Sequence, residues 1–113
     1  MKYEPRFERF EAVGPQGVRS TVAFLRAGFL TAGDRPELYF FSVDGDEVVV
    51  GISGNALRAF QRGRRFFSRE EKIDLAGFLL KRRMEAGTAL ESQNLFLRDE
   101  ELARIAAELG IPA

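Results

Sequence analysis

The segment from residue 38 to residue 52 constrains the fold most, because it has the pattern of two adjacent strands joined by a tight turn. The runs LYFFSV (38–43) and EVVVGI (47–52) are rich in β-branched and aromatic residues, and Asp44-Gly45-Asp46 connects them. Such runs on either side of an Asp-Gly pair are typical of a β-hairpin. We therefore expect a hairpin with a two-residue turn centred on Asp44 and Gly45.

Both faces of this hairpin are apolar. Alternation of side chains along each strand sorts them into two sets. One face carries Tyr39, Phe41, Val48 and Val50, and the other carries Leu38, Phe40 and Val49. A strand with one face in water would alternate with polar residues, so we expect this hairpin to be covered on both sides. The second cover is the preceding part of the chain, a second copy of the chain or another partner.

The residues before this hairpin allow two interpretations. The segments 6–13 and 18–25 flank Gly14-Pro15-Gln16-Gly17, in which Pro suits the second position of a turn and Gly the fourth. This pattern favours a second hairpin. The alternative treats residues 6–30 as helical, with Phe7, Phe10 and Val13 as an apolar stripe.

The period of the apolar pattern changes from two to 3.6 after residue 52, which predicts three helices. Ser53, Gly54 and Asn55 can cap a short helix over 56–62 that ends at Gly63. Ser68 and Glu71 form a capping box that begins a longer helix ending near Gly87. A last helix is expected to begin with Asp99 as its cap and to stop at Gly110.

These elements predict an α+β fold: an antiparallel sheet of about four strands, made of two consecutive hairpins, followed by three helices packed on one face. The chain has 113 residues, of which 45% are hydrophobic, and it shows no repeat or long linker. A chain of this size suits one hydrophobic core. We therefore expect a single domain over residues 1–113.

The residue types present exclude several classes of catalytic and metal site. The chain contains no cysteine and no histidine, so thiolate or imidazole zinc sites and a Ser-His-Asp triad cannot be built from it. Gly51-Ile52-Ser53-Gly54-Asn55 only partly imitates a nucleophile elbow, because Asn55 stands where the motif requires glycine. Asp44 and Asp46 are typical turn residues rather than magnesium ligands. We expect no enzymatic activity, no cofactor and no metal.

Residues 58–83 are unusually basic for a chain with a formal net charge of zero. They contain nine basic and only three acidic side chains. In one continuous helix over 58–69, arginines spaced by about one turn would form a ridge able to follow phosphates. Gly63 and the Ser68 cap predict a break in that helix, which would scatter the ridge. The candidate nucleic-acid contacts are Arg58, Arg62, Arg64, Arg65 and Arg69.

Two functional hypotheses follow from these patterns. The first is a non-enzymatic binding or regulatory module that forms a homodimer or binds another protein through Leu38, Phe40, Val49 and Phe78. The second is a protein that binds nucleic acid, single strands rather than duplex, through the basic segment 58–83. Charges near the N-terminus replace the apolar run of a signal peptide, and we expect a cytoplasmic protein that does not bind membranes.

Overall fold

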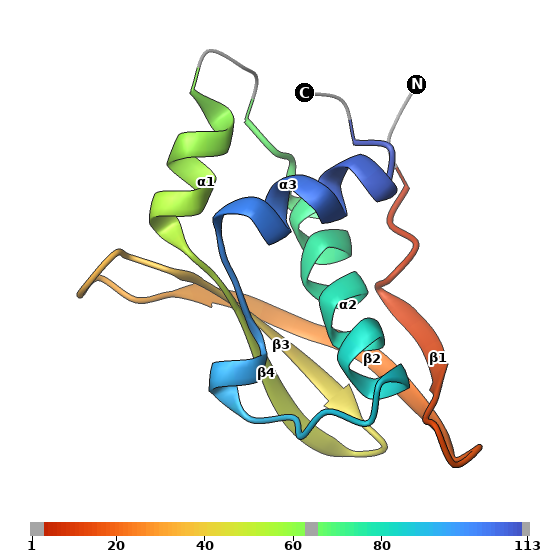
Figure 1. The fold of residues 1–113 in the computed structure, drawn as a ribbon. Helices are drawn as coiled ribbons and strands as arrows, with labels where there is room; N and C mark the ends of the chain where they lie inside the picture. Colours follow the sequence, from red (N-terminus) through yellow and green to blue (C-terminus); the bar gives the residue numbers. More distant parts are fainter. Residues whose placement is uncertain (1–3, 63–65, 112–113) are drawn as a thin grey trace.

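The sheet of this protein contains five strands, which lie side by side in the order in which they occur along the chain (Figure 1). The computed structural model describes residues 4–62 and 66–111. Within these residues the strands are β1 (Arg9–Val13), β2 (Arg19–Phe29), β3 (Glu37–Val43), β4 (Asp46–Ile52) and β5 (Phe96–Leu97). The α-helices are α1 (Gly54–Gln61), α2 (Arg69–Glu85) and α3 (Asp99–Glu108), and a short 3-10 turn spans Ser92–Asn94. The predicted α+β arrangement is confirmed, with one strand more than expected.

The hairpin of β3 and β4 forms with the predicted register. Val43 lies opposite Asp46, which leaves two residues in the turn. Asp44 and Gly45 have φ angles of 51° and 93°, as a type I′ turn requires at both central positions. The carboxylate of Asp44 also accepts a hydrogen bond of 2.8 Å from the amide of Thr21, so β2 helps to fix this turn.

Strands β1 and β2 form the other predicted hairpin, so the strand interpretation of this region is confirmed and the helical alternative is wrong. Arg9 lies opposite Ala23, and Val13 lies opposite Arg19. The turn closes where the amide of Gly14 donates to the carbonyl of Val18 at 2.9 Å.

The fifth strand corrects the prediction of a purely antiparallel sheet. β5 pairs with β4 in the parallel direction, with Gly51 beside Phe96 and Ile52 beside Leu97. The chain leaves β4, passes through α1 and α2, and returns to the same edge, so the sheet is mixed. A parallel strand needs a long crossover of this kind.

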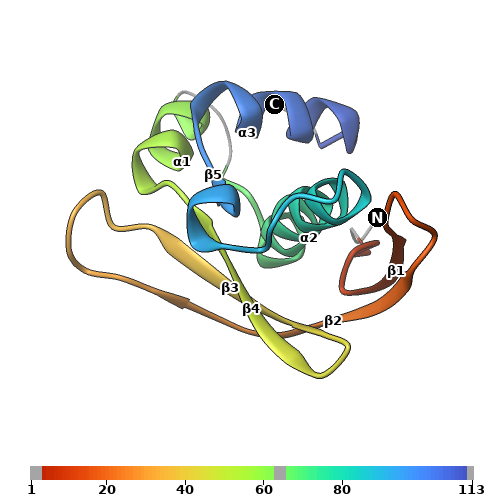
Figure 2. The same cartoon turned by 60° about the horizontal axis from the view of Figure 1, so that its bottom comes forward.

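All three described α-helices lie on one face of the sheet, as predicted (Figure 2). The core lies between this helix layer and the inner face of the sheet. Tyr39, Phe41 and Val50 of the central hairpin are at most 3% exposed there. Ile73, Ala76 and Leu80 of α2 are fully buried in the same core. No described helix is both long enough and apolar enough to cross a membrane.

Two of the predicted helix starts are confirmed and one is wrong. The Ser53 side chain accepts from the amide of Ala56, and Ser68 with Glu71 forms the complete capping box. Asp99, however, is the first residue of α3 rather than its cap, because the extended backbone of β5 continues through Arg98 directly into the helix. Among the described residues, no side chain caps that helix start.

The outer face of the sheet, which points away from the helices, is not covered by any other described part of the chain (Figure 2). The first hairpin extends the sheet sideways instead of folding over this face. Leu38, Phe40 and Val49 are only half-buried. The Arg26 guanidinium lies over the Phe40 ring, 4.2 Å from its centroid. The expectation of a hairpin covered on both sides is therefore wrong for the protomer, where side chains of the same sheet give partial cover.

A buried carboxylate on α2 fixes the path of the N-terminal segment. Asp74 is fully buried and accepts hydrogen bonds from the amides of Arg6, at 2.9 and 3.1 Å, and of Phe7, at 2.8 Å. Gly77 allows this close approach, since a Cβ atom there would lie 2.6 Å from the Cβ of Phe7. The segment before β1 is thus held against the helix layer.

Replacement of Asp74 by alanine should destabilise the fold by about 2 to 4 kcal/mol, because two partly buried amides lose their acceptor and each unpaired buried group costs roughly 1–3 kcal/mol. Denaturant-induced unfolding of the purified variant measures this loss. The control is Glu70→Ala on the same helix, whose carboxylate lies 3.9 Å from the guanidinium of the exposed Arg69. An equally small effect of both substitutions would contradict the anchoring role of Asp74.

Candidate functional site

Part of β2 has no strand neighbour on one side. Pairing of β1 with β2 begins at Arg9 opposite Ala23, and the last bond between them runs from the amide of Phe24 to the carbonyl of Glu8 at 2.7 Å. β2 continues to Phe29, paired only with β3. Among the described residues nothing pairs with the other side of residues 25–29. We call this stretch the open β2 edge.

The backbone of the open β2 edge presents hydrogen-bonding groups outward. The amide of Leu30 donates to the carbonyl of Pro36 at 3.0 Å, so Leu30, Gly28 and Arg26 face β3. In an antiparallel ladder the residues between them direct both N–H and C=O to the opposite side. Ala27 and Phe29 therefore direct their backbone groups toward the missing neighbour.

Large apolar side chains are concentrated at this edge. Leu25 is 47% exposed, Phe29 is 70% exposed and Leu30, which follows the strand, is 51% exposed. A β-bulge between Phe24 and Arg26 makes Leu25 the extra residue of the strand. Natural edge strands are usually protected by charges, proline or a cover. β1 follows that rule with Arg9 and Glu11, whereas the charged residue of the open β2 edge, Arg26, is turned toward Glu47 across the sheet.

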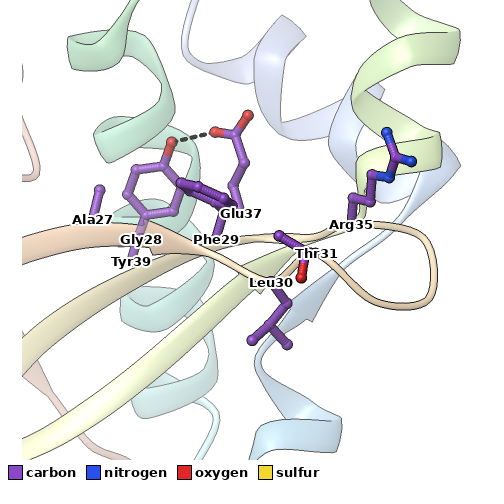
Figure 3. A pocket seen from close by; sticks show the side chains of 8 residues that line it. All are labelled: Ala27, Gly28, Phe29, Leu30, Thr31, Arg35, Glu37 and Tyr39. Atoms are coloured by element: carbon purple, nitrogen blue, oxygen red, sulfur yellow. Dashed lines mark hydrogen bonds between the residues drawn. The ribbon is translucent and has the colours of Figure 1, made fainter.

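A pocket of about 630 Å³ lies along the same stretch (Figure 3). Phe29, Glu37 and Tyr39 project to the helix side of the sheet, and Leu30 points to the opposite side. Arg35 stands at the far end of the pocket, close to α1. The lining residues are Ala27, Gly28, Phe29, Leu30, Thr31, Arg35, Glu37 and Tyr39.

The polar wall of the pocket is already engaged in internal contacts. The Tyr39 hydroxyl donates to one Glu37 oxygen at 2.7 Å, and the Lys72 ammonium donates to the other at 3.1 Å. Burial, followed by the hydrogen bond to Glu37, raises the pKa of Tyr39 above its ordinary value. The phenol therefore stays protonated and acts as a fixed donor. This wall supports a bound group by shape and contributes no free base.

The loop that connects β2 to β3 is held against the start of α1 by hydrogen bonds. Ser53 donates to the carboxylate of Asp34 at 2.6 Å, and Arg58 donates to the carbonyl of Asp34 at 3.0 Å. Gly54 is needed at this contact, because a Cβ atom there would lie 2.0 Å from the Asp34 carbonyl oxygen. The tip of the hairpin is thus held in place while the open β2 edge beside it is unpaired.

The four candidate interface residues do not form one surface. Leu38, Phe40 and Val49 share the outer face, as the predicted register requires. Phe78 lies on α2 on the other side of the sheet, where its ring meets Phe7 edge to face at a centroid distance of 5.5 Å. It is half-buried and packs against the core.

The candidate nucleic-acid contacts also separate. Arg58 lies on α1 and donates to Asn55 as well as to the hairpin loop. Arg62 follows α1 with extended backbone angles, and Arg69 begins α2 with its guanidinium 5.4 Å from the ring centroid of Phe24. Because α1 ends at Gln61, the continuous ridge over 58–69 does not form. Arg64 and Arg65 lie outside the described residues.

Acids that lie outside residues 58–83 in the sequence neutralise much of the rest of the basic segment. Arg83 reaches both carboxylate oxygens of Glu101 at 3.0 Å. The described pairs are Lys72–Glu37, Lys81–Glu85, Arg82–Glu108 and Arg83–Glu101. The charge imbalance along the sequence is thus largely compensated in space.

The motifs that resembled chemical sites have structural roles here. Ser53 caps α1 and binds Asp34, instead of standing exposed on a nucleophile elbow. Asp44 and Gly45 form the hairpin turn. Within residues 4–62 and 66–111, no group of three or more acidic side chains is placed to hold a metal ion.

The sequence contains a signal for the open β2 edge that the two hairpin patterns do not reveal. The alternation of apolar residues continues past residue 25 through Ala27 and Phe29, whereas the preceding segment is too short to pair with it along its whole length. A strand that is longer than its neighbour leaves an edge unpaired.

Comparison of the chain with family models, with curated proteins and with solved structures found no match in any of the three.

The contact of Asp34 with Ser53 should make stability depend on pH. The hydrogen bond from Ser53 is the largest influence and lowers the pKa of Asp34 below its ordinary value of 3.8, with the amides of Asn55 and Gly54 acting in the same direction. A lowered folded-state pKa gives stability that is present above 3.8 and is lost as pH falls through the folded value.

The melting temperature of the wild type should therefore exceed that of Asp34→Asn at neutral pH, and the difference should shrink as the solution is acidified below pH 3.8. Thermal unfolding followed by circular dichroism measures it. The difference between the two proteins removes the contributions of other carboxylates, such as Asp44. A difference that stays constant with pH would contradict the assignment.

Proposed function

We propose that this protein is a non-enzymatic interaction module that binds an extended polypeptide segment by adding it as a strand at the open β2 edge. The observation that carries the proposal is the combination, in residues 25–29, of unpaired backbone groups with the exposed side chains of Leu25 and Phe29. Strand addition pairs these backbone groups and covers these side chains at once. The backbone bonds give affinity, and side-chain pockets give specificity.

Contact with water is energetically unfavourable for the apolar side chains of this edge. Burial of an aromatic side chain such as Phe29, now 70% exposed, stabilises a complex by roughly 1.5–3 kcal/mol when it is complete. The outward groups of Ala27 and Phe29 can bond to an added strand with little rearrangement, because β3 holds this part of β2 in an extended form. The edge is therefore preorganised.

The pocket suits the side chains of an added strand. Its floor is formed by Ala27 and Gly28, which are small, and its walls include Phe29 and the fixed pair of Tyr39 with Glu37. An apolar side chain of the bound segment can enter on the helix side. On the outer side, Leu30 offers a second apolar contact.

The binding of nucleic acid is less well supported. It needs several unpaired cations along one path, whereas the cations of α2 are engaged with acids of β3, α2 and α3. Arg58 is engaged with the hairpin loop. The strand-addition proposal uses residues that the fold leaves unpaired.

The test uses a fluorescent heptapeptide that copies residues 24–30, with the folded protein kept at low micromolar concentration. We expect the anisotropy of the peptide to rise on binding, and the affinity to fall at least tenfold for Phe29→Lys, which places a charge on the edge. Val18→Lys is the matched control, since Val18 is 66% exposed but lies in the turn between β1 and β2.

A second probe separates backbone pairing from general hydrophobic contact. The same peptide with N-methyl groups on alternate residues keeps its side chains but cannot form the ladder, and it should not bind. Equal binding of the two peptides, or equal loss of binding in both lysine variants, would argue against strand addition. Circular dichroism confirms that both variants are folded.

A further inference from the structure

We infer that the segment added to the open β2 edge is the same edge of a second copy of this chain, in an antiparallel dimer whose two-fold axis passes beside Ala27. The inference rests on the proposed function and names its partner. Two-fold symmetry requires a surface that complements itself. The pattern of residues 25–29 has this property, as the register shows.

In this register each Ala27 lies opposite the other, with its backbone groups directed at its partner. The exposed Phe29 of each copy lies diagonal to Ala27 of the partner on the helix side of the sheet, where a large ring and a small side chain can pack together. Arg26 lies opposite the partner's Gly28, which has no side chain to collide with it. The Arg26 guanidinium keeps its two bonds to Glu47, across the sheet from the new interface.

The charges at the two ends of the interface are complementary. Asp74 draws residues 6 and 7 away from the line of β1, so the hairpin tip of the partner can lie beside Glu8. That tip carries Arg35. Both side chains are exposed, and neither forms an ion pair with another described residue. Two copies also meet without net repulsion, since the formal net charge of the chain is zero.

The size of the interface predicts a weak dimer. Five residues of strand extend about 17 Å at roughly 3.3 Å per residue. Such a strip buries on the order of 400 Å² per copy, about half of the roughly 800 Å² per partner in a standard stable interface. We therefore expect a dissociation constant in the range of tens of micromolar, with monomers at nanomolar concentration.

Sedimentation velocity over a range of concentrations tests for the dimer. The wild-type mass should rise from 12.7 kDa toward twice that value as concentration increases through the micromolar range. The midpoint should shift at least tenfold upward for Phe29→Lys and should not shift for Val18→Lys. A wild type that stays monomeric at millimolar concentration would overturn the dimer.

An engineered cysteine tests the position of the two-fold axis, because the chain has no cysteine of its own. Directly opposed residues of a hydrogen-bonded antiparallel pair have Cα atoms about 5.5 Å apart, which a disulfide can span. Ala27→Cys should form a disulfide-linked dimer under mild oxidation much faster than Val18→Cys. Equal rates would exclude this register, even if a dimer exists.

The failures of the two proposals are distinguishable. Peptide binding by a protein that remains monomeric would overturn the second-copy inference and leave strand addition intact. A protein that stays monomeric and does not bind the peptide would overturn both proposals. A dimer that Phe29→Lys does not weaken would place the contact on another surface and would also overturn the inference.

Discussion

The buried carboxylate of Asp74 determines where the sheet of this protein stops. It binds the amides of Arg6 and Phe7 and so turns the chain toward α2 just before β1 begins. If the segment continued straight instead, its residues would run alongside Leu25 and the rest of β2. Asp74 thus contacts two residues that precede it by 68 and 67 positions, Arg6 and Phe7. This contact completes the core and leaves the open β2 edge unpaired.

Elsewhere in the fold, charged side chains are likewise engaged in contacts within the protein. The basic residues of α2 contact acids of neighbouring elements, and Arg26 covers Phe40 on the outer face. Near the pocket, Glu37 is held by Tyr39 and by Lys72. The apolar groups that remain exposed near the β2–β3 hairpin are therefore the ones for which an external partner makes physical sense.

The sequence was sufficient to predict those features that depend on a few adjacent residues. The Asp44-Gly45 turn and the Ser68 capping box each depend on a few adjacent residues, and the structure confirms both. β5 is only two residues long, Phe96 and Leu97, and its pairing with β4 depends on how the helices pack, so no local pattern could predict it. The open β2 edge likewise depends on the distant Asp74. The apolar pattern of the outer face predicted an interface. The partial cover by Arg26 depends on which residues of β2 and β3 lie opposite each other, which the local pattern did not show.

Hydrogen exchange at the amides of Ala27 and Phe29 as a function of protein concentration tests most directly whether the open β2 edge accepts a strand. These groups face no described neighbour in the protomer and would be bonded in an added strand. If a second copy adds at this edge, exchange will be fast in dilute solution and strongly slowed at high concentration, with no change at Gly28, whose amide faces β3. Protection of Ala27 and Phe29 that is independent of concentration would show that the edge is never open, and this would contradict strand addition at β2.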